Sequence, residues 1–173
     1  MIKALAPLAL ISLAACQTVA DLPEERLGSA TLTMANGVPV GTAQLLARGD
    51  TVTLAFAGAA LPAGAHGFHL HTTGTCTAPD FTSAGGHLNP RNNEHGSLNP
   101  AGKHLGDLPN LTVGANGTAS TQVDLDGTRA YLMDVLFDAD GTAVMIHAGP
   151  DDYRSDPAGD AGSRIACGVL KRS

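Results

Sequence analysis

Short stretches in which polar and apolar residues alternate run along most of the chain, and turn residues separate them. The first stretch covers Ala30 to Met34, the pair Asn36-Gly37 follows it, and alternation returns from Val40 to Ala47. Alternation of period two is typical of a half-buried β-strand, and Asn-Gly between two such stretches favours a tight hairpin. We therefore expect an all-β domain of about eight short strands, arranged as a sandwich or flattened barrel. Further strands are expected at 51–56, 64–71, 111–113, 119–125, 131–137, 142–147 and 163–170.

The composition of the chain supports this fold class. Of its 173 residues, 43% are hydrophobic and 15% are charged, and there are 21 glycines, 10 prolines and no tryptophan. A chain of this length can bury one core, and the many turn formers suit short strands better than long helices. The formal charge of −6 makes nucleic acid a poor partner, because nucleic-acid binding needs clustered basic residues.

The first residues are typical of an export signal. Lys3 is followed by an uncharged, mostly apolar run that is too short to span a bilayer and ends in small residues before Cys16. We expect residues 1–15 to be a signal peptide that is cut ahead of a lipidated Cys16; the alternative is ordinary secretion with a free Cys16. Residues 16–27 show no apolar period and are expected to form a lipidated tether before a domain over 28–173. Removal of the signal peptide deletes one lysine and no acid, so the charge goes from −6 to −7.

Three cysteines in an exported protein leave one without an intramolecular partner. Lipidation of Cys16 accounts for the odd thiol, and Cys76 and Cys167 can then pair and close a loop of about 90 residues. The alternative is two unpaired buried cysteines, which are less common in an oxidising compartment.

The strand pattern stops between Thr72 and Pro109. A connection this long without an apolar period is either disordered or held in place by something other than a core. It contains Cys76, so a disulfide can supply part of the missing order. It also contains three histidines and an aspartate, which give the four nitrogen and oxygen ligands of a tetrahedral zinc site. These residues are His87, His95, His104 and Asp107.

Histidines also occupy alternate positions within the strand pattern. His69 and His71 would project from one face of a strand while Phe68 and Leu70 project from the other, so two imidazoles can meet one ion. His147 ends another alternating run and can face them from an adjacent strand. Together with one loop histidine, these three form an all-imidazole cluster that suits a tetragonal copper(II) site. The alternative is a surface strand whose histidines turn to water.

Four motifs in this chain carry a resemblance to a known family. They are Gly64-Ala65-His66-Gly67-Phe68-His69-Leu70-His71, Gly162-Ser163-Arg164-Ile165-Ala166-Cys167-Gly168-Val169, Gly85-Gly86-His87-Leu88-Asn89-Pro90 and His104-Leu105-Gly106-Asp107-Leu108. The first two resemble the two signatures of copper/zinc superoxide dismutases, and the others stand where that family has its zinc loop. The resemblance runs from about Ala30 to Lys171 and is to the bacterial periplasmic, lipoprotein-type branch. It implies an eight-stranded Greek-key flattened barrel or sandwich, immunoglobulin-like, with long metal-binding loops.

The resemblance also implies one copper ion and one zinc ion per subunit, with the imidazolate of His87 bridging both. The implied copper ligands are His69, His71, His87 and His147, and the implied zinc ligands are His87, His95, His104 and Asp107. The resemblance further implies three supporting features: Arg164 beside the copper, the structural histidine His66, and the Cys76–Cys167 disulfide. It also implies that Asp151 links a copper-ligand histidine to a zinc-ligand histidine; Asp152 is the alternative for that link.

The implied activity is that of a superoxide dismutase, with Arg164 and His87 as catalytic residues. Two superoxide anions become O₂ and H₂O₂ while copper cycles between Cu(II) and Cu(I), and His87 leaves the copper and takes up a proton. The alternative is a noncatalytic envelope copper/zinc-binding protein on the same fold. The implied partners are superoxide and a membrane reached through lipidated Cys16, with no nucleic acid, and a homodimer is a possible assembly. The expected location is the bacterial cell envelope, in the periplasm and anchored to a membrane.

A superoxide dismutase with a charge of −7 needs a local positive funnel, because its net charge repels the anion at long range. The segment between His147 and Arg164 contains one cation, Arg154, and four aspartates. The candidates for steering are therefore Lys103 and Arg91, from the stretch that lacks a strand pattern.

Overall fold

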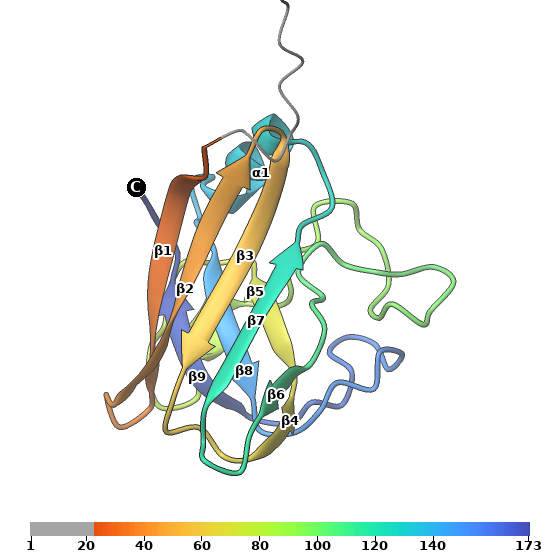
Figure 1. Cartoon of the computed structure of the whole chain (residues 1–173). Helices are drawn as coiled ribbons and strands as arrows, with labels where there is room; N and C mark the ends of the chain where they lie inside the picture. The colour runs from red at the N-terminus through yellow and green to blue at the C-terminus, as the bar shows by residue number, and fades with distance from the viewer. Residues whose placement is uncertain (1–22) are drawn as a thin grey trace, which may run out of the picture.

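The computed structural model describes residues 23–173, which form a curled β-sheet with long loops beside it (Figure 1). The predicted signal peptide, Cys16 and the tether as far as residue 22 lie outside the described residues. The elements are β1 (Glu25–Met34), β2 (Pro39–Arg48), β3 (Thr51–Gly58), β4 (Gly64–His66), β5 (Phe68–His71), β6 (Leu111–Val113), β7 (Ala119–Asp124), α1 (Arg129–Leu136), β8 (Ala143–His147), β9 (Arg164–Val169) and β10 (Lys171–Arg172). No helix within residues 23–173 has the length and apolar character needed to cross a membrane.

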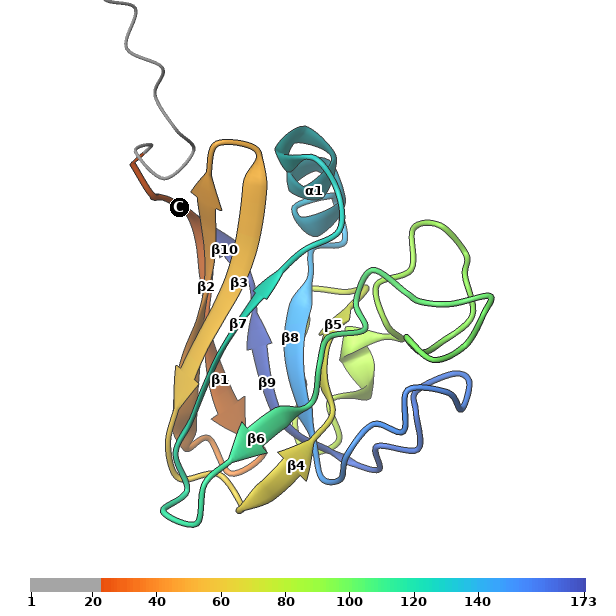
Figure 2. The same ribbon diagram turned by 45° about the vertical axis from the view of Figure 1, so that its right-hand side comes forward.

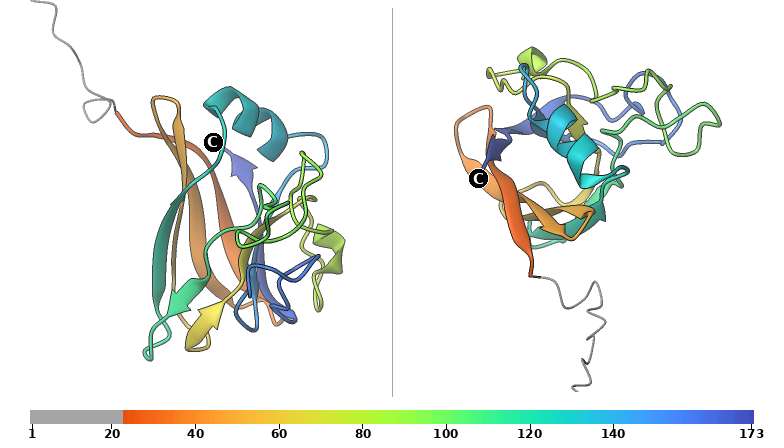
Figure 3. Two further views of the ribbon diagram at one scale, coloured as in Figure 1. Left: turned by 90° about the vertical axis from the view of Figure 1, so that its right-hand side faces the viewer. Right: turned by 90° about the horizontal axis from the view of Figure 1, so that it is seen from above.

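Antiparallel pairing joins the strands of the large sheet in the order β5-β8-β9-β1-β2-β3-β7, with β10 beside β1. Strands β4 and β6 form a second, two-stranded sheet. Seen from above, the large sheet curls round on itself, and α1 lies across one open end (Figure 3). After β3 the chain crosses to β5 at the far edge of the sheet and later returns to place β7 beside β3. Such crossings are typical of a Greek-key barrel, so the predicted all-β fold is confirmed.

The inner face of the sheet is apolar, as the alternation predicts. On β2, Ala43 and Leu45 are buried, whereas Thr42 and Gln44 between and beside them are exposed. The predicted turn at Asn36-Gly37 joins β1 to β2, and Asn36 Oδ1 accepts a hydrogen bond from Val38 N. Each fully buried leucine or phenylalanine contributes about 1.5–3 kcal/mol to folding. The largest fully buried side chains of this core include Phe56, Phe68, Leu32, Leu45, Leu54, Leu70, Leu111, Leu132, Leu136 and Ile146.

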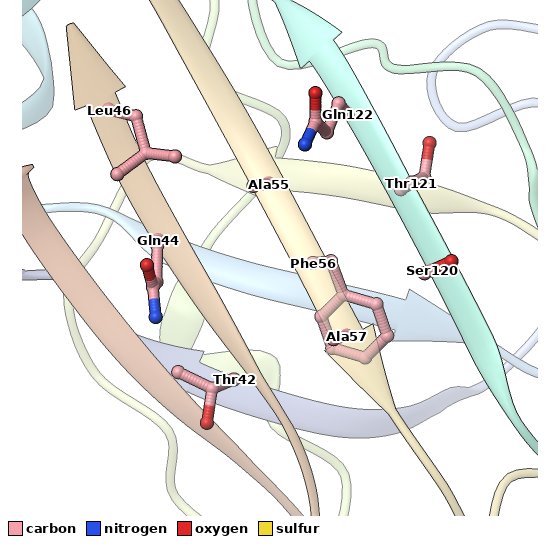
Figure 4. A pocket seen from close by; sticks show the side chains of 9 residues that line it. All are labelled: Thr42, Gln44, Leu46, Ala55, Phe56, Ala57, Ser120, Thr121 and Gln122. Atoms are coloured by element: carbon pink, nitrogen blue, oxygen red, sulfur yellow. The ribbon is translucent and has the colours of Figure 1, made fainter. Parts of the chain in front are cut away.

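The outer face of β2, β3 and β7 is open to solvent and carries a shallow hollow (Figure 4). Gln44 and Leu46 stand on β2, and Ser120 and Gln122 stand on β7, with Ala55 of β3 between them. The lining side chains of this hollow include no charged group and no imidazole. It therefore offers neither a metal ligand nor an acid–base group.

One predicted strand, residues 131–137, is wrong, because most of it belongs to helix α1. Thr128 begins the helix, and its side chain accepts a hydrogen bond from Tyr131 N at 3.3 Å. Leu132 and Leu136 lie four residues apart and bury the same face of the helix under the open end of the barrel. A short apolar segment of this kind fits either period, and the N-cap decides between them.

Two strand boundaries also differ from the prediction. Residues 25–27, which the sequence assigned to the tether, belong to β1, where Glu25 pairs with Ala47 and Leu27 is buried. The polar side chains at the start of β1 are exposed, so the backbone pairing leaves no apolar period in the sequence. The expected strand over 64–71 is divided at Gly67, because β4 pairs with β6 and β5 pairs with β8.

Two loops, residues 72–109 and 148–163, lie outside the barrel beside β5 and β8 (Figure 2). A small apolar cluster fastens the 72–109 loop to the sheet, where Phe81 and Ala84 pack with Met145 and Cys167. The predicted disulfide between Cys76 and Cys167 is confirmed and joins the same loop to β9. A disulfide and a satellite cluster therefore help to order this loop, which contains no regular strand.

Candidate metal centre

Strands β5 and β8 bring three histidines together. Phe68 and Leu70 of β5 enter the barrel core, so His69 and His71 lie on the other side of the strand. Strand β8 pairs antiparallel with β5 and ends at His147. The ring centroids of His69 and His147 are 4.8 Å apart. The predicted alternation thus places the three rings on one surface of the sheet.

His87 joins these three from the 72–109 loop. Backbone contacts hold the loop against β5. Leu88 N donates a hydrogen bond to Leu70 O at 2.8 Å, and the backbones of His87 and His71 form an isolated antiparallel β-bridge. One ligand nitrogen from each of the four rings lies within 4.8 Å of the others. Each ring also has one buried nitrogen without a hydrogen-bond partner among residues 23–173. These nitrogens are His69 Nδ1, His71 Nε2, His87 Nε2 and His147 Nε2.

The remaining nitrogen of each strand histidine is held by an acceptor. His71 Nδ1 donates to Gly85 O at 2.9 Å, and His147 Nδ1 donates to Gly162 O at 3.0 Å. A carbonyl oxygen only accepts, so in both rings the proton lies on Nδ1 and Nε2 keeps its lone pair. His69 Nε2 lies 2.8 Å from Asp151 Oδ2, which leaves His69 Nδ1 as its free nitrogen. Acceptors of this kind fix the ring orientation that a metal ligand needs.

A second group of side chains meets at the carboxylate of Asp107. The Nδ1 atoms of His87, His95 and His104 lie 2.8, 3.0 and 3.1 Å from Asp107 Oδ1. The contact from His95 Nδ1 lacks the alignment of a hydrogen bond. Asp107 Oδ2 accepts from the backbone N–H groups of Gly96 and His104, at 2.9 and 3.0 Å. These two bonds hold the carboxylate in place within the loop.

Close approach of the two loops also shapes this second group. A Cβ atom at position 96 would overlap the carbonyl of Tyr153, and Gly96 has a φ of +100°. Leu98 N donates to the same Tyr153 carbonyl at 3.0 Å. Gly96 therefore lets the 148–163 loop pack against the residues around His95.

Asp151 links the two groups of histidines. Its Oδ2 lies 2.8 Å from His69 Nε2, its Oδ1 lies 3.1 Å from His95 Nε2, and the residue is 3% exposed. Asp152 is exposed and accepts hydrogen bonds within its own loop, from Arg154 N and Ser155 N. The structure thus places Asp151, and not Asp152, between the two groups.

The donor atoms of both groups are in the protonation state that binds metal. Burial, helped by the neighbouring imidazoles, lowers the pKa of His71 to about 2 and the pKa values of His87 and His147 to about 4, so these rings are neutral at pH 7. Burial alone would raise the pKa of Asp107, but the hydrogen bonds from His87 and Gly96 outweigh it and hold that pKa well below its usual range. Neutral imidazole and ionised carboxylate are the forms that coordinate metal ions.

The two donor sets fit the ions that the sequence suggests. Buried polar atoms without partners are costly, and four of them around one point are explained if they hold an ion. An all-imidazole set suits copper(II), and three imidazole nitrogens with one carboxylate oxygen suit tetrahedral zinc. His87 belongs to both sets, because its Nε2 faces the first group and its Nδ1 lies at Asp107.

Arg164, the first residue of β9, lies beside the first group of histidines. Its Nη1 donates to Phe81 O and its Nη2 donates to Gly85 O, both at 2.7 Å. The carbonyl of Gly85 also accepts from His71, so one peptide fixes both the guanidinium and a ring. Arg164 lines a hollow together with His71, His87 and His147, which we call the histidine hollow.

His66 stands apart from both groups. Its Nδ1 lies 2.8 Å from His147 O and its Nε2 lies 2.9 Å from Pro62 O. Both nitrogens face carbonyl oxygens, so neither is available to a metal ion. His66 instead connects β4 to the end of β8, next to a residue of the first group.

Both steering candidates are engaged with other residues and do not line the histidine hollow. Lys103 Nζ is 3.1 Å from Asp126 Oδ2, and the guanidinium of Arg91 lies 5.4 Å from the ring centroid of Tyr131. Neither Lys103 nor Arg91 is among the lining residues of the histidine hollow.

The histidine hollow instead contains two acidic residues: Glu94, which the sequence did not single out, and Asp156, one of the four aspartates between His147 and Arg164. Glu94 lines it from the 72–109 loop, and Asp156 lines it from the 148–163 loop. The two residues are far apart in the sequence and belong to no motif. Only the packing of the two loops brings them together, so no sequence signal identifies them.

Comparison with known proteins agrees with this geometry. Residues 40–170 match the family model described as copper/zinc superoxide dismutase. The chain is 42% identical over 154 residues to superoxide dismutase [Cu-Zn] 1 of Aquifex aeolicus, covering 87% of this chain and 91% of that protein.

Solved structures show the same relationship. A SOD-like protein from Bacillus subtilis superimposes with a TM-score of 0.78 at 37% identity, covering 85% of this chain and 100% of the other. The Cu/Zn superoxide dismutase from Brucella abortus gives a TM-score of 0.67 at 29% identity, covering 86% of this chain and 100% of the other. Sequence, fold and paired histidine groups agree, and the chain belongs to the copper/zinc superoxide dismutase family.

Proposed function

We propose that this protein is a superoxide dismutase that holds one copper ion and one zinc ion. The observation that carries the proposal is the set of four buried imidazole nitrogens without hydrogen-bond partners among residues 23–173. One of them belongs to His87, whose ring is also part of the second group, around Asp107. The copper ligands are His69, His71, His87 and His147. The zinc ligands are His87, His95, His104 and Asp107.

The overall reaction converts two superoxide anions and two protons into O₂ and H₂O₂. Copper, when bound, supplies the one-electron chemistry, whereas zinc has no accessible second oxidation state. Arg164 binds and orients the anion, because its guanidinium lines the same hollow as the histidines and is fixed by two carbonyl groups. A fixed guanidinium loses little freedom when an anion binds to it.

His87 handles the proton. Its Nε2 takes up a proton in one half of the cycle and gives it to the peroxide product in the other half. His87 Nδ1 and Asp107 Oδ1 lie 2.8 Å apart, and both would be zinc ligands in the loaded protein, so the ring would keep its orientation while Nε2 changes its proton. Asp151 contacts both His69 and His95 and so fixes the position of the first histidine group relative to the second.

The test is superoxide consumption by the purified, metal-loaded protein, with copper and zinc content measured on the same sample. A His147→Ala variant removes one copper ligand and should lose copper and most of the activity while it keeps zinc. The matched control is Gln44→Ala on the outer face of β2, which should keep both metals and full activity. If the His147→Ala and wild-type proteins consume superoxide equally fast, the proposal is wrong. If the loaded wild type holds both ions without consuming superoxide, it is a noncatalytic copper/zinc-binding protein.

We also propose that the protein is exported to the periplasm and anchored to a membrane through a lipid on Cys16. The support for this proposal is the sequence of residues 1–16. Mass spectrometry of the protein from its bacterial host should show an acylated Cys16 as the first residue. A Cys16→Ser variant should leave the membrane fraction; a wild type without the acyl mass contradicts the proposal. Homodimer formation stays a prediction of the resemblance.

A further inference from the structure

The charges around the histidine hollow have an unexpected balance. Three of its lining residues carry a fixed charge: Arg164, Glu94 and Asp156. The other lining residues are imidazoles or uncharged. The hollow therefore has one fixed positive charge and two fixed negative charges, in a family whose substrate is an anion.

Both carboxylates are held in place by the loops. Asp156 Oδ1 accepts a hydrogen bond from His95 N at 2.7 Å, and Glu94 Oε2 accepts one from Asn99 Nδ2 at 2.9 Å. Both residues are exposed, and neither forms an ion pair within residues 23–173. Their negative charges thus stay exposed on the lining of the hollow, without an ion-pair partner in the described part of the chain.

Nearby cations do not restore the balance. Lys103 is paired with Asp126, and Arg91 lies over the ring of Tyr131. Arg154 donates to Leu98 O at 3.4 Å and does not line the hollow. Arg164 is the one lysine or arginine among the lining residues of the hollow.

The unpartnered atoms behind these carboxylates are ligands for a cation. His71, His87 and His147 line the hollow, are at least 92% buried, and each has a free Nε2. A metal ion that reaches them from solvent through the histidine hollow meets the carboxylates of Glu94 and Asp156, which line it. Clefts lined by one sign of charge raise the local concentration of the opposite ion and its rate of entry by about 10- to 1,000-fold in strong cases.

We propose that Glu94 and Asp156 form an acidic mouth that speeds the entry of divalent copper to the histidines and slows the entry of anionic substrate. The first half of this inference concerns loading of the metal-free protein and does not depend on activity. The second half rests on the proposed superoxide dismutase function. In the loaded protein, the positive charge of the bound ions would partly offset the negative charges of Glu94 and Asp156. The effect on the rate of anion entry is therefore smaller than the effect on the rate of copper uptake.

The loading half is tested by the rate at which the metal-free, full-length protein takes up Cu²⁺, followed by the appearance of the copper absorption band. Glu94→Gln and Asp156→Asn keep the hydrogen-bond acceptors and remove the charges. Each should slow uptake by about two- to fivefold at 10 mM salt, and the double variant by about tenfold. At 0.5 M salt the differences should vanish, because the Debye length falls below about 5 Å. The matched control is Asp134→Asn, which removes the same charge from an exposed position of α1 away from the hollow.

Equal uptake rates for the double variant and the Asp134→Asn control at low salt would overturn the acidic mouth. So would an uptake rate in the wild type that does not fall as salt rises. Circular dichroism of each metal-free variant checks that slower uptake does not come from a change in fold.

The substrate half is tested on the loaded protein with two anions. The kcat/KM for superoxide should rise with ionic strength in the wild type, and the double variant should exceed the wild type about twofold to fivefold at 10 mM salt. Azide, titrated by the shift of the copper absorption band, should bind the double variant more tightly by a similar factor. If kcat/KM falls with salt and azide affinity is unchanged, the substrate half is wrong. If the loaded protein consumes no superoxide at all, the proposed function fails, while the copper-uptake and azide results still decide the role of the mouth.

Discussion

The interior of the barrel and the layer of loops outside it are held together by different forces. Inside the barrel, leucine, phenylalanine and valine side chains from most strands bury one another. Leu88 and Leu108 of the 72–109 loop reach that core as well, but most of the loop lies outside it. Its other ordering contacts include a disulfide, a small cluster around Phe81, and imidazoles gathered at Asp107. The barrel gains its stability from apolar burial, which needs no ion. The geometry of the loops depends on groups that also bind metal, so the loops should respond to metal loss, oxidation state and pH far more than the barrel does.

The shared ring of His87 gives the largest expected difference between the two regions. His87→Ala removes a ligand from both metal groups at once, so both ions should be lost. Loss of a residue that only supports a metal ligand typically lowers activity by roughly 10- to 100-fold, and superoxide consumption should fall by more than that here. The barrel should stay folded, because His87 contributes nothing to the apolar core. Metal analysis, a superoxide assay and far-ultraviolet circular dichroism measure the three quantities. A variant that retains both ions and activity contradicts the shared-ring arrangement.

The disulfide should matter next most, because it connects the two regions. The double variant Cys76→Ser, Cys167→Ser opens a loop whose ends are 91 residues apart in sequence. The chain-entropy model gives a loss of roughly 4–5 kcal/mol for a loop of about 90 residues, and measured losses are often smaller. Denaturant unfolding of the oxidised wild type, the reduced wild type and the variant measures this change. The reduced wild type should match the variant, and a variant as stable as the oxidised protein would show that the bond does not stabilise the fold.

Adjacent leucines on β2 test the barrel alone. Leu45 is fully buried in the core, whereas Leu46 faces outwards and lines the shallow hollow on the outer face of β2, β3 and β7. Leu45→Ala should lower the free energy of unfolding by about 2–5 kcal/mol, because it leaves a cavity. Leu46→Ala should cost less than about 1 kcal/mol, and neither change should alter the metal content. Equal losses from the two substitutions would mean that the sheet does not have one buried face and one exposed face.

The same division explains how much the sequence could predict. Alternation identified the strands around the core, such as β2 and β3, because one face of each is buried. It failed at residues 131–137, where the N-cap at Thr128 and the pair Leu132 and Leu136 favour a helix. It also missed the first residues of β1, whose pairing involves exposed polar side chains.

In the loops, the types of residue predicted the chemistry, and their positions came only from the fold. Three histidines and an aspartate on one loop already match the donor set of a zinc site. The choice of Asp151 over Asp152 depends on which carboxylate is buried between His69 and His95. The placement of Glu94 and Asp156 depends on how the two loops pack. No local pattern in the sequence encodes either of these.

The pH dependence of stability gives the smallest effect per residue and separates the two regions in the metal-free protein. The folded state lowers the pKa of His87 and His147 from the usual 6.5 to about 4, and that of His71 to about 2. Below pH 6.5 the unfolded chain binds protons that the folded chain does not, so the free energy of unfolding should fall as the pH falls. The expected loss is about 0.7 kcal/mol for each of these histidines between pH 7 and pH 6. Urea unfolding of the metal-free protein at several pH values measures this slope, and His147→Gln should make it shallower, whereas Gln44→Ala should leave it unchanged. Stability that is flat or rises as the pH falls from 7 to 5 would mean that the imidazoles are not held neutral by burial.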